Sequence, residues 1–246
     1  MSVQRYEKNI YMCFFSKYNC TFEIKFVNLQ WIWGIPIKTT CADTMKLVIM
    51  TKSTFFVEED KILASLFDEG LDALHLSKPG SAPMLCERLL TLLPDECHRR
   101  ITVHEHYYLK NEYSLAGIHI ENMDEENPQG YRGNISRTCS SIDRLKEMKK
   151  KSQYVFLANV FKGDGMNGHT EGLSIQELEN ASRKGMIDKH VYALGGVQLD
   201  NIRMARDLGF GGVVVCDDLW NQFDIHRHQD YKELIAHFEK LKKAVG

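Results

Sequence analysis

Two pairs of glycines near the C-terminal end are the most informative chemical feature of the chain. Gly195-Gly196 follows the apolar run 191–194, and a second pair, 211–212, opens the run that ends at Val215-Cys216-Asp217. Glycines placed after a strand let backbone amides approach an anion without obstruction from a Cβ atom. The pattern therefore predicts a phosphate-binding site formed by Gly195, Gly196, Val215, Cys216 and Asp217. A plain tight turn at Gly195-Gly196 is the alternative interpretation.

A second candidate cluster lies in the segment 74–80, where His75, Ser77 and Lys78 accompany an apolar run. Alternation along a strand places His75 and Ser77 on the same side. We expect these three residues to be catalytic, with Lys78 binding a ligand diphosphate as a point charge. A solvated lysine at the surface is the other interpretation of Lys78.

Histidines and carboxylates gather after the next two apolar runs. His104-Glu105-His106 follows one run, His119 lies in the next, and Asp124 comes shortly after it. Two carboxylates at one edge, Glu105 and Asp124, could hold Mg²⁺ through water, which suits diphosphate chemistry. The H-x-H pair could instead bind zinc, although no third ligand follows at helical spacing. Loop charges around one buried histidine are the third interpretation.

Polar side chains also follow two later apolar runs, at Ser136 and at Asn159. Together with His104, these side chains are candidates for orienting a heteroaromatic ring and its diphosphate. Ser and Asn side chains at such positions can equally cap helices.

The elements that must position these residues alternate regularly from Met45 onward. Their Val, Ile, Leu and Ala content is typical of strands buried on both faces of a parallel sheet. We predict strands at 46–51, 73–76, 101–104, 117–120, 134–137, 154–158, 191–194 and 212–216. Amphipathic segments at 58–68, 83–93, 141–151, 174–184, 200–208 and 231–243 predict helices between and after them.

Eight strands that alternate with helices predict a (βα)8 TIM barrel, with a doubly wound sheet as the main alternative. The segment from Ile120 to Asn134 is polar and contains Pro128. We therefore expect a loop in place of the fourth helix. Chemistry in this fold belongs at the C-terminal ends of the strands, where all the candidate residues lie.

The organisation we expect is an N-terminal extension, 1–44, followed by one barrel domain, 45–246. The extension carries a strand-like stretch at 22–27, and Met45 is a second candidate start. A start-site artefact, a disordered extension and an arm that packs on the barrel are the alternatives.

Composition limits the class of partner. The formal net charge is −2, and the seven cysteines include no C-x-x-C pair. No broad basic field suggests nucleic acid, and no apolar run is long enough to span a membrane. We expect a cytoplasmic protein with reduced thiols that acts on small molecules. The oligomeric state stays open, a homo-oligomer included.

The pattern as a whole resembles the thiamine phosphate synthase and thiazole tautomerase family from Lys46 to about Trp220. The best-matching segments are 74–78, 117–120, 154–157, 194–196 with Asn201, and 209–213. The resemblance implies transfer of a hydroxymethylpyrimidine unit from its diphosphate to a thiazole phosphate, with Mg²⁺ and release of pyrophosphate. It also implies that the glycine segments hold the thiazole phosphate, that Glu105 and Asp124 stand where two aspartates bind metal, and that Ser136 contacts the pyrimidine.

The chain departs from the family pattern in the half that handles the diphosphate. The family's Gln-x-Arg-x-Lys becomes His75, Ser77 and Pro79, with Lys78 out of step. Asn159 stands where the tautomerase branch has a histidine. Three functions therefore stay open: a divergent synthase, a tautomerase-like isomerase with His75 or His119 as the base, and a binding protein that keeps only the phosphate site.

Overall fold

The computed structural model describes residues 5–6, 9–10, 45–165, 168–224 and 231–246. The chain divides into two units, Met1–Cys41 and Ala42–Gly246. In the first unit, β1 (Arg5–Tyr6) pairs antiparallel with β2 (Asn9–Ile10). The strand-like stretch at 22–27 lies outside the described residues.

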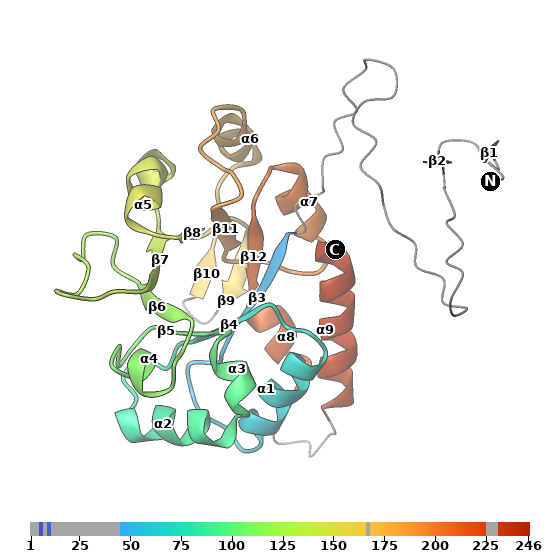
Figure 1. Cartoon of the computed structure of the whole chain (residues 1–246). Coiled ribbons are helices and arrows are strands. Elements are labelled where there is room, and N and C mark those ends of the chain that lie inside the picture. The colour runs from blue at the N-terminus through green and yellow to red at the C-terminus, as the bar shows by residue number, and fades with distance from the viewer. Residues whose placement is uncertain (1–4, 7–8, 11–44, 166–167, 225–230) are drawn as a thin grey trace, which may run out of the picture. The chain divides into compact units, whose positions relative to one another are not determined.

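The second unit is a closed barrel of eight parallel strands, so the predicted (βα)8 fold is confirmed (Figure 1). The strands run in the order β3 (Lys46–Met50), β4 (Ala73–Leu76), β5 (Ile101–Val103), β6 (Gly117–Ile120), β7 (Asn134–Cys139), β8 (Tyr154–Leu157), β11 (Val191–Leu194) and β12 (Gly212–Val215). The ring closes between β12 and β3, where Val213 pairs with Leu47. Every strand therefore ends at the same face, which we call the mouth.

Helices cover the outside of the barrel (Figure 1). They are α1 (Glu59–Asp68), α2 (Pro83–Leu92), α3 (Asp95–His98), α4 (Leu109–Glu112), a 3₁₀ turn (Ile142–Arg144), α5 (Leu145–Lys151), α6 (Ile175–Arg183), α7 (Ile202–Asp207), α8 (Asp217–Trp220) and α9 (Lys232–Val245). The start of α6 is fixed by a capping box between Ser174 and Glu177. Helix α9 buries Leu234, Phe238 and Leu241 against the barrel.

The link between β6 and β7 contains no helix, as its polar sequence predicted. Arg137 on β7 is fully buried and binds this loop through its guanidinium group. Its guanidinium donates hydrogen bonds to the carbonyl oxygen of Glu125 (2.6 Å) and to the side-chain oxygen of Asn127 (2.5 Å). A buried cation with several carbonyl partners can therefore replace the packing that a helix would supply.

After β8 the chain forms a short hairpin that the sequence did not predict. Strand β9 (Gly163–Gly165) pairs antiparallel with β10 (Gly168–Thr170). Glycines interrupt the β pattern in this segment, so neither propensity nor alternation indicated a strand.

The inside of the barrel is apolar on one side and polar on the other. Val48, Phe156 and Val214 form an apolar interior cluster on β3, β8 and β12. On β4 to β7, and at the residue directly after β5, the buried interior positions are polar; they are His75, Thr102, His104, His119 and Ser136. Buried polar groups need hydrogen-bond partners, and here they supply them to one another.

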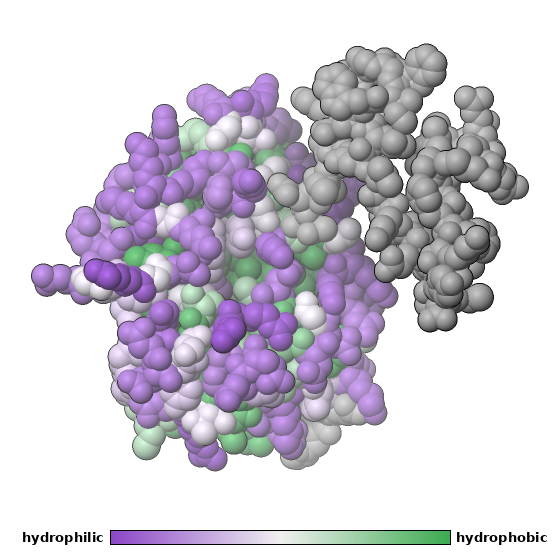
Figure 2. Space-filling view, viewed as in Figure 1, coloured by the Kyte–Doolittle hydropathy of each residue, from purple (hydrophilic) through white to green (hydrophobic). Residues whose placement is uncertain are grey.

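The surface of the described part is mainly polar. Hydrophilic side chains cover most of the viewed face, with smaller apolar areas between them (Figure 2). No helix in the described ranges is long and apolar enough to cross a membrane.

Candidate functional site

The loops after β8 and β11 pack against each other around the predicted phosphate site. Gly195 and Gly196 have φ angles of 94° and 61°. A Cβ atom on Gly196 would lie 2.5 Å from the carbonyl oxygens of Phe161 and Lys162. Only glycine combines this conformation with this close approach. The Asn201 side chain adds a hydrogen bond to the Gly196 carbonyl oxygen (2.7 Å).

The second half of the predicted phosphate site is a short helix, α8, which follows β12. The Cys216 carbonyl oxygen accepts the first hydrogen bonds of this helix. The indole of Trp220 fixes the helix to the end of β3 by donating to the Met50 carbonyl oxygen (2.7 Å). Burial, and then Asp217, raises the pKa of the Cys216 thiol to about 12, so this cysteine is not a nucleophile.

Two carboxylates occupy the first turn of α8, at Asp217 and Asp218. His237 on α9 lies 2.7 Å from the Asp218 carboxylate. First-turn amides of a helix attract anions, whereas these carboxylates repel them. The glycine conformations are explained by packing of the loops on each other, the side-chain charge at α8 is negative, and the phosphate site stays a prediction.

Lys78 does not lie open at the mouth. Its side chain is fully buried, and its ammonium group forms an ion pair with Glu59 (2.6 Å). The ammonium also donates to the Thr54 carbonyl oxygen (3.0 Å) and lies 4.5 Å from the centre of the Phe55 ring. Burial lowers the pKa of Lys78 and raises that of Glu59, while the pair opposes both shifts. The predicted contact with a diphosphate requires this pair to open.

The two predicted metal-binding carboxylates have other partners. Glu105 accepts a hydrogen bond from the backbone amide of Lys78 (2.9 Å), and Asp124 binds Arg144 (2.6 Å). The Asp124 side chain is 69% exposed, so Arg144 shields it from only one side. Each carboxylate would have to share or leave this partner to bind Mg²⁺, and the predicted magnesium site stays a prediction.

A chain of hydrogen bonds runs through the polar half of the barrel from the mouth to its other end. The Glu121 carboxylate, directly after β6, lies 2.6 Å from Nδ1 of His104. Nε2 of His104 lies 2.8 Å from Nδ1 of His75, whose Nε2 lies 2.8 Å from the Tyr154 hydroxyl. With neutral imidazoles, the three hydrogen bonds can share one direction: Tyr154 donates to His75, His75 donates to His104, and His104 donates to the Glu121 carboxylate.

A second chain reaches the same carboxylate from β7. Thr138 donates its hydroxyl proton to Glu121 (3.0 Å) and lies 2.8 Å from Nε2 of His119. Nδ1 of His119 lies 2.8 Å from the Ser136 hydroxyl. Burial works to raise the pKa of Glu121, but the hydrogen bonds from His104 and Thr138 outweigh it and lower this pKa. Glu121 is therefore held ionised.

Within the described ranges, His75, His104 and His119 are also the one group of three or more metal-binding side chains whose ligand atoms converge. The rings of His104 and His119 stack, with centroids 4.2 Å apart and planes 20° apart. An imidazole binds a metal in its own plane, so two stacked rings cannot share one ion. His106 takes no part, because it binds the Ser81 carbonyl oxygen. The cluster is a hydrogen-bonded network rather than a zinc site.

The remaining predicted residues are placed separately. Ser77 directly follows β4, and its amide donates a hydrogen bond to the Thr51 hydroxyl (3.1 Å). Asn159 has a φ of 55° and packs its backbone against Gly195. Ser136 is buried in the interior network instead of facing the mouth. The roles predicted for these residues stay predictions.

Sequence reasoning did not single out Glu121 or Tyr154. Glu121 stands one residue beyond β6, which is the position where this fold commonly places functional groups. The interaction between Tyr154 and His75 joins residues 79 positions apart and could not be inferred from spacing.

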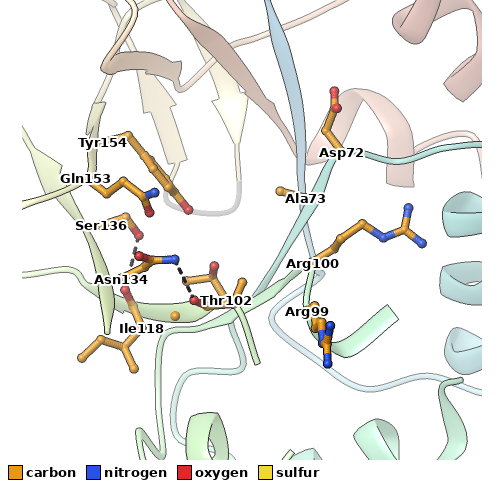
Figure 3. A pocket seen from close by; sticks show the side chains of 12 residues that line it. Asp72, Ala73, Arg99, Arg100, Thr102, Ile118, Asn134, Ser136, Gln153 and Tyr154 are labelled. Carbon is orange, nitrogen blue, oxygen red and sulfur yellow. Dashed lines mark hydrogen bonds between the residues drawn. The ribbon is translucent and has the colours of Figure 1, made fainter. Parts of the chain in front are cut away.

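A cavity of about 190 Å³ opens at the end of the barrel opposite the mouth (Figure 3). Its walls come from residues at the starts of strands, among them Thr102, Ser136 and Tyr154. Burial raises the pKa of Tyr154, and hydrogen bonds with Ser136 and Thr102 partly offset this rise. The interior network therefore spans the barrel from this cavity to Glu121.

The fold and the site together define a (βα)8-barrel protein with a glycine pair after β11, a short helix after β12 and an anchored carboxylate at its mouth. Its solved relatives identify the family. A thiamine phosphate pyrophosphorylase from Bacteroides thetaiotaomicron is 46% identical, covers 81% of this chain and 97% of its own, and superposes with a TM-score of 0.74. The chain belongs to the thiamine phosphate pyrophosphorylase family, also called the thiamine phosphate synthase family, and the resemblance is confirmed.

More distant structures show the fold alone. A thiamine phosphate pyrophosphorylase from Pyrococcus furiosus is 17% identical over 83% of this chain and 96% of its own, with a TM-score of 0.64. A 3-hexulose-6-phosphate synthase is 13% identical over 82% of this chain and 100% of its own, with a TM-score of 0.56. Neither family models nor curated protein sequences match the chain.

Proposed function

We propose that this protein is a cytoplasmic thiamine phosphate synthase, which joins hydroxymethylpyrimidine diphosphate to thiazole phosphate and releases pyrophosphate. The observation that carries the proposal is the 46% identity with a thiamine phosphate pyrophosphorylase, of which this chain covers 97%. An identity this high over a whole barrel favours the same reaction class.

The loop that contains Gly195 and Gly196 supports the part of the proposal that concerns the retained phosphate. The backbone around Gly195 and Gly196 approaches its neighbours more closely than any side chain allows. The loops after the last two strands are also the recurrent phosphate site of this fold. We therefore assign the thiazole phosphate to these loops and to the start of α8.

The pyrimidine ring then lies toward β5 to β7. The interior cluster of Val48, Phe156 and Val214 is apolar, whereas Glu121 and Thr138 lie at the mouth beside the polar half of the interior. Mg²⁺ belongs to the proposal as the partner of the diphosphate, supplying positive charge to the leaving group.

The test is a reaction of the full-length protein with both substrates and Mg²⁺, in which thiamine phosphate and pyrophosphate are quantified separately. Equal amounts of both products, dependent on both substrates, are expected. Absence of thiamine phosphate above the background without protein would contradict the proposal.

A second candidate function is binding without turnover, and one observation favours it. Lys78 is paired with Glu59, and Asp124 with Arg144, so the groups expected to act on a diphosphate already have partners. Calorimetry with thiazole phosphate and thiamine phosphate, combined with the turnover assay, distinguishes a binding protein from the synthase. The isomerase alternative lacks a base among the predicted histidines, since His75 and His119 are fully buried.

A further inference from the structure

The Glu121 carboxylate is the one end of the interior network that meets solvent at the mouth. Its side chain is 55% exposed, whereas the His104 side chain beside it is fully buried. An isolated acidic side chain in a loop would be mobile and solvated. Glu121 is instead held by His104, directly after β5, and by Thr138 on β7.

Each carboxylate oxygen of Glu121 accepts one hydrogen bond from inside the barrel. His104 lies against Oε1 and Thr138 donates to Oε2. A carboxylate has about four acceptor positions, so two of them stay directed away from the network. The interior bonds therefore fix the plane of the group and leave its outer edge available to a ligand.

The partners are themselves fixed, so this orientation does not depend on a single bond. His104 is stacked on His119 and bonded to His75, and all three rings are buried. Held geometry and retained charge are the requirements for a recognition group.

We propose that Glu121 is the specificity-determining residue for the pyrimidine, and that its carboxylate accepts hydrogen bonds from the amino group of an aminopyrimidine. The proposal rests on the function proposed above and names a residue that the resemblance does not supply. The acceptor-only edge of an ionised carboxylate matches a ring edge that carries an N–H donor and rejects one that lacks it. His104 and Thr138 are positioning residues, because they act through Glu121.

The experiment measures binding of three probes to the full-length protein by calorimetry. The probes are 4-amino-5-hydroxymethyl-2-methylpyrimidine, its analogue with hydrogen in place of the amino group, and inorganic pyrophosphate. The native protein is expected to prefer the amino compound about tenfold or more, as for a hydrogen bond to a charged group. Glu121→Gln should abolish this preference and leave pyrophosphate affinity unchanged or slightly higher.

Glu125→Gln is the matched control, since it removes the same charge from an exposed residue in the same loop. It should keep the preference for the amino compound. Thr138→Val removes one donor to Glu121 without emptying the buried cluster. It should weaken binding of the amino compound about threefold and raise the pKa of Glu121, measured by carboxyl-carbon NMR.

Three results would overturn the proposal: native protein without a preference, Glu121→Gln with an unchanged preference, or Glu125→Gln with an equal loss. Failure of the proposed reaction gives a different result. In that case thiamine phosphate does not form, yet the preference for the amino compound and its dependence on Glu121 persist.

Discussion

The buried pair of Lys78 and Glu59 allows a quantitative test of what this lysine does. Replacing Lys78 with Met leaves the Glu59 carboxylate, whose side chain is 2% exposed, without its cation. One oxygen of this carboxylate, Oε2, already has no hydrogen-bond partner in the structure. Breaking a buried pair from one side costs about 3–5 kcal/mol, because it leaves an uncompensated buried charge.

Removing both charges should cost much less than removing one. In the double variant Lys78→Met, Glu59→Leu, apolar side chains of similar volume fill the site beside Phe55. We expect its free energy of unfolding to lie within about 2 kcal/mol of the native value, because the desolvation cost of both charges is removed as well. Urea unfolding followed by circular dichroism gives the four free energies of the cycle.

The same double variant also tests whether Lys78 contributes to pyrophosphate binding independently of its effect on stability. The Lys78 ammonium is already bound by Glu59 and by the Thr54 carbonyl oxygen, so pyrophosphate affinity should stay within about twofold of the native value. If the single variant Lys78→Met loses less than about 1 kcal/mol of unfolding free energy, the structural role of the Lys78–Glu59 pair is refuted. A stable double variant with strongly reduced pyrophosphate affinity would restore the predicted role in diphosphate binding.

Three further predictions concern the loops, the interior and the metal. Gly196→Ala should reduce thiazole phosphate affinity at least about tenfold in calorimetry, since its Cβ meets carbonyl oxygens, whereas Gly80→Ala, with similar φ and open space, should not. Burial, and then neighbouring histidines, lowers the pKa of His75 and His119 well below 6.5. The unfolded chain therefore binds more protons than the folded protein below about pH 6.5. As the pH is lowered through this range, the free energy of unfolding should decrease by about 1.4 kcal/mol per pH unit for each histidine. The raised pKa of Glu59 has the opposite effect on the pH dependence of stability, so the measurement uses the double variant, which lacks Glu59. A urea midpoint that does not change between pH 7.5 and 5.5 would contradict this prediction. Chelation with EDTA should stop pyrophosphate release and added Mg²⁺ should restore it, while activity that survives chelation would exclude the predicted cofactor.

The barrel was predictable because its strands are short, apolar and regularly spaced. The predicted ranges 73–76, 117–120 and 191–194 coincide with β4, β6 and β11. The short elements α3, α4 and α8 were missed, since four residues carry too little periodicity to stand out. The β9–β10 hairpin was missed because glycines mask its strand character.

The candidate site was less predictable, because its decisive contacts join distant segments. Sequence position placed Lys78 and Asp124 correctly after strands, yet it could not show that Glu59 and Arg144 pair with them. A strand pattern also reveals which side chains face inward but not the partner each one finds. The network that ends at Glu121 depends on such partners and became visible only in three dimensions.

Formation of thiamine phosphate is the most direct test of the proposed function. The full-length protein is incubated with hydroxymethylpyrimidine diphosphate, thiazole phosphate and Mg²⁺, and both products are measured in the same sample. The account predicts thiamine phosphate and pyrophosphate in equal amounts, with neither formed when one substrate is omitted. Binding of thiazole phosphate without formation of either product would contradict the synthase and leave the binding protein in its place.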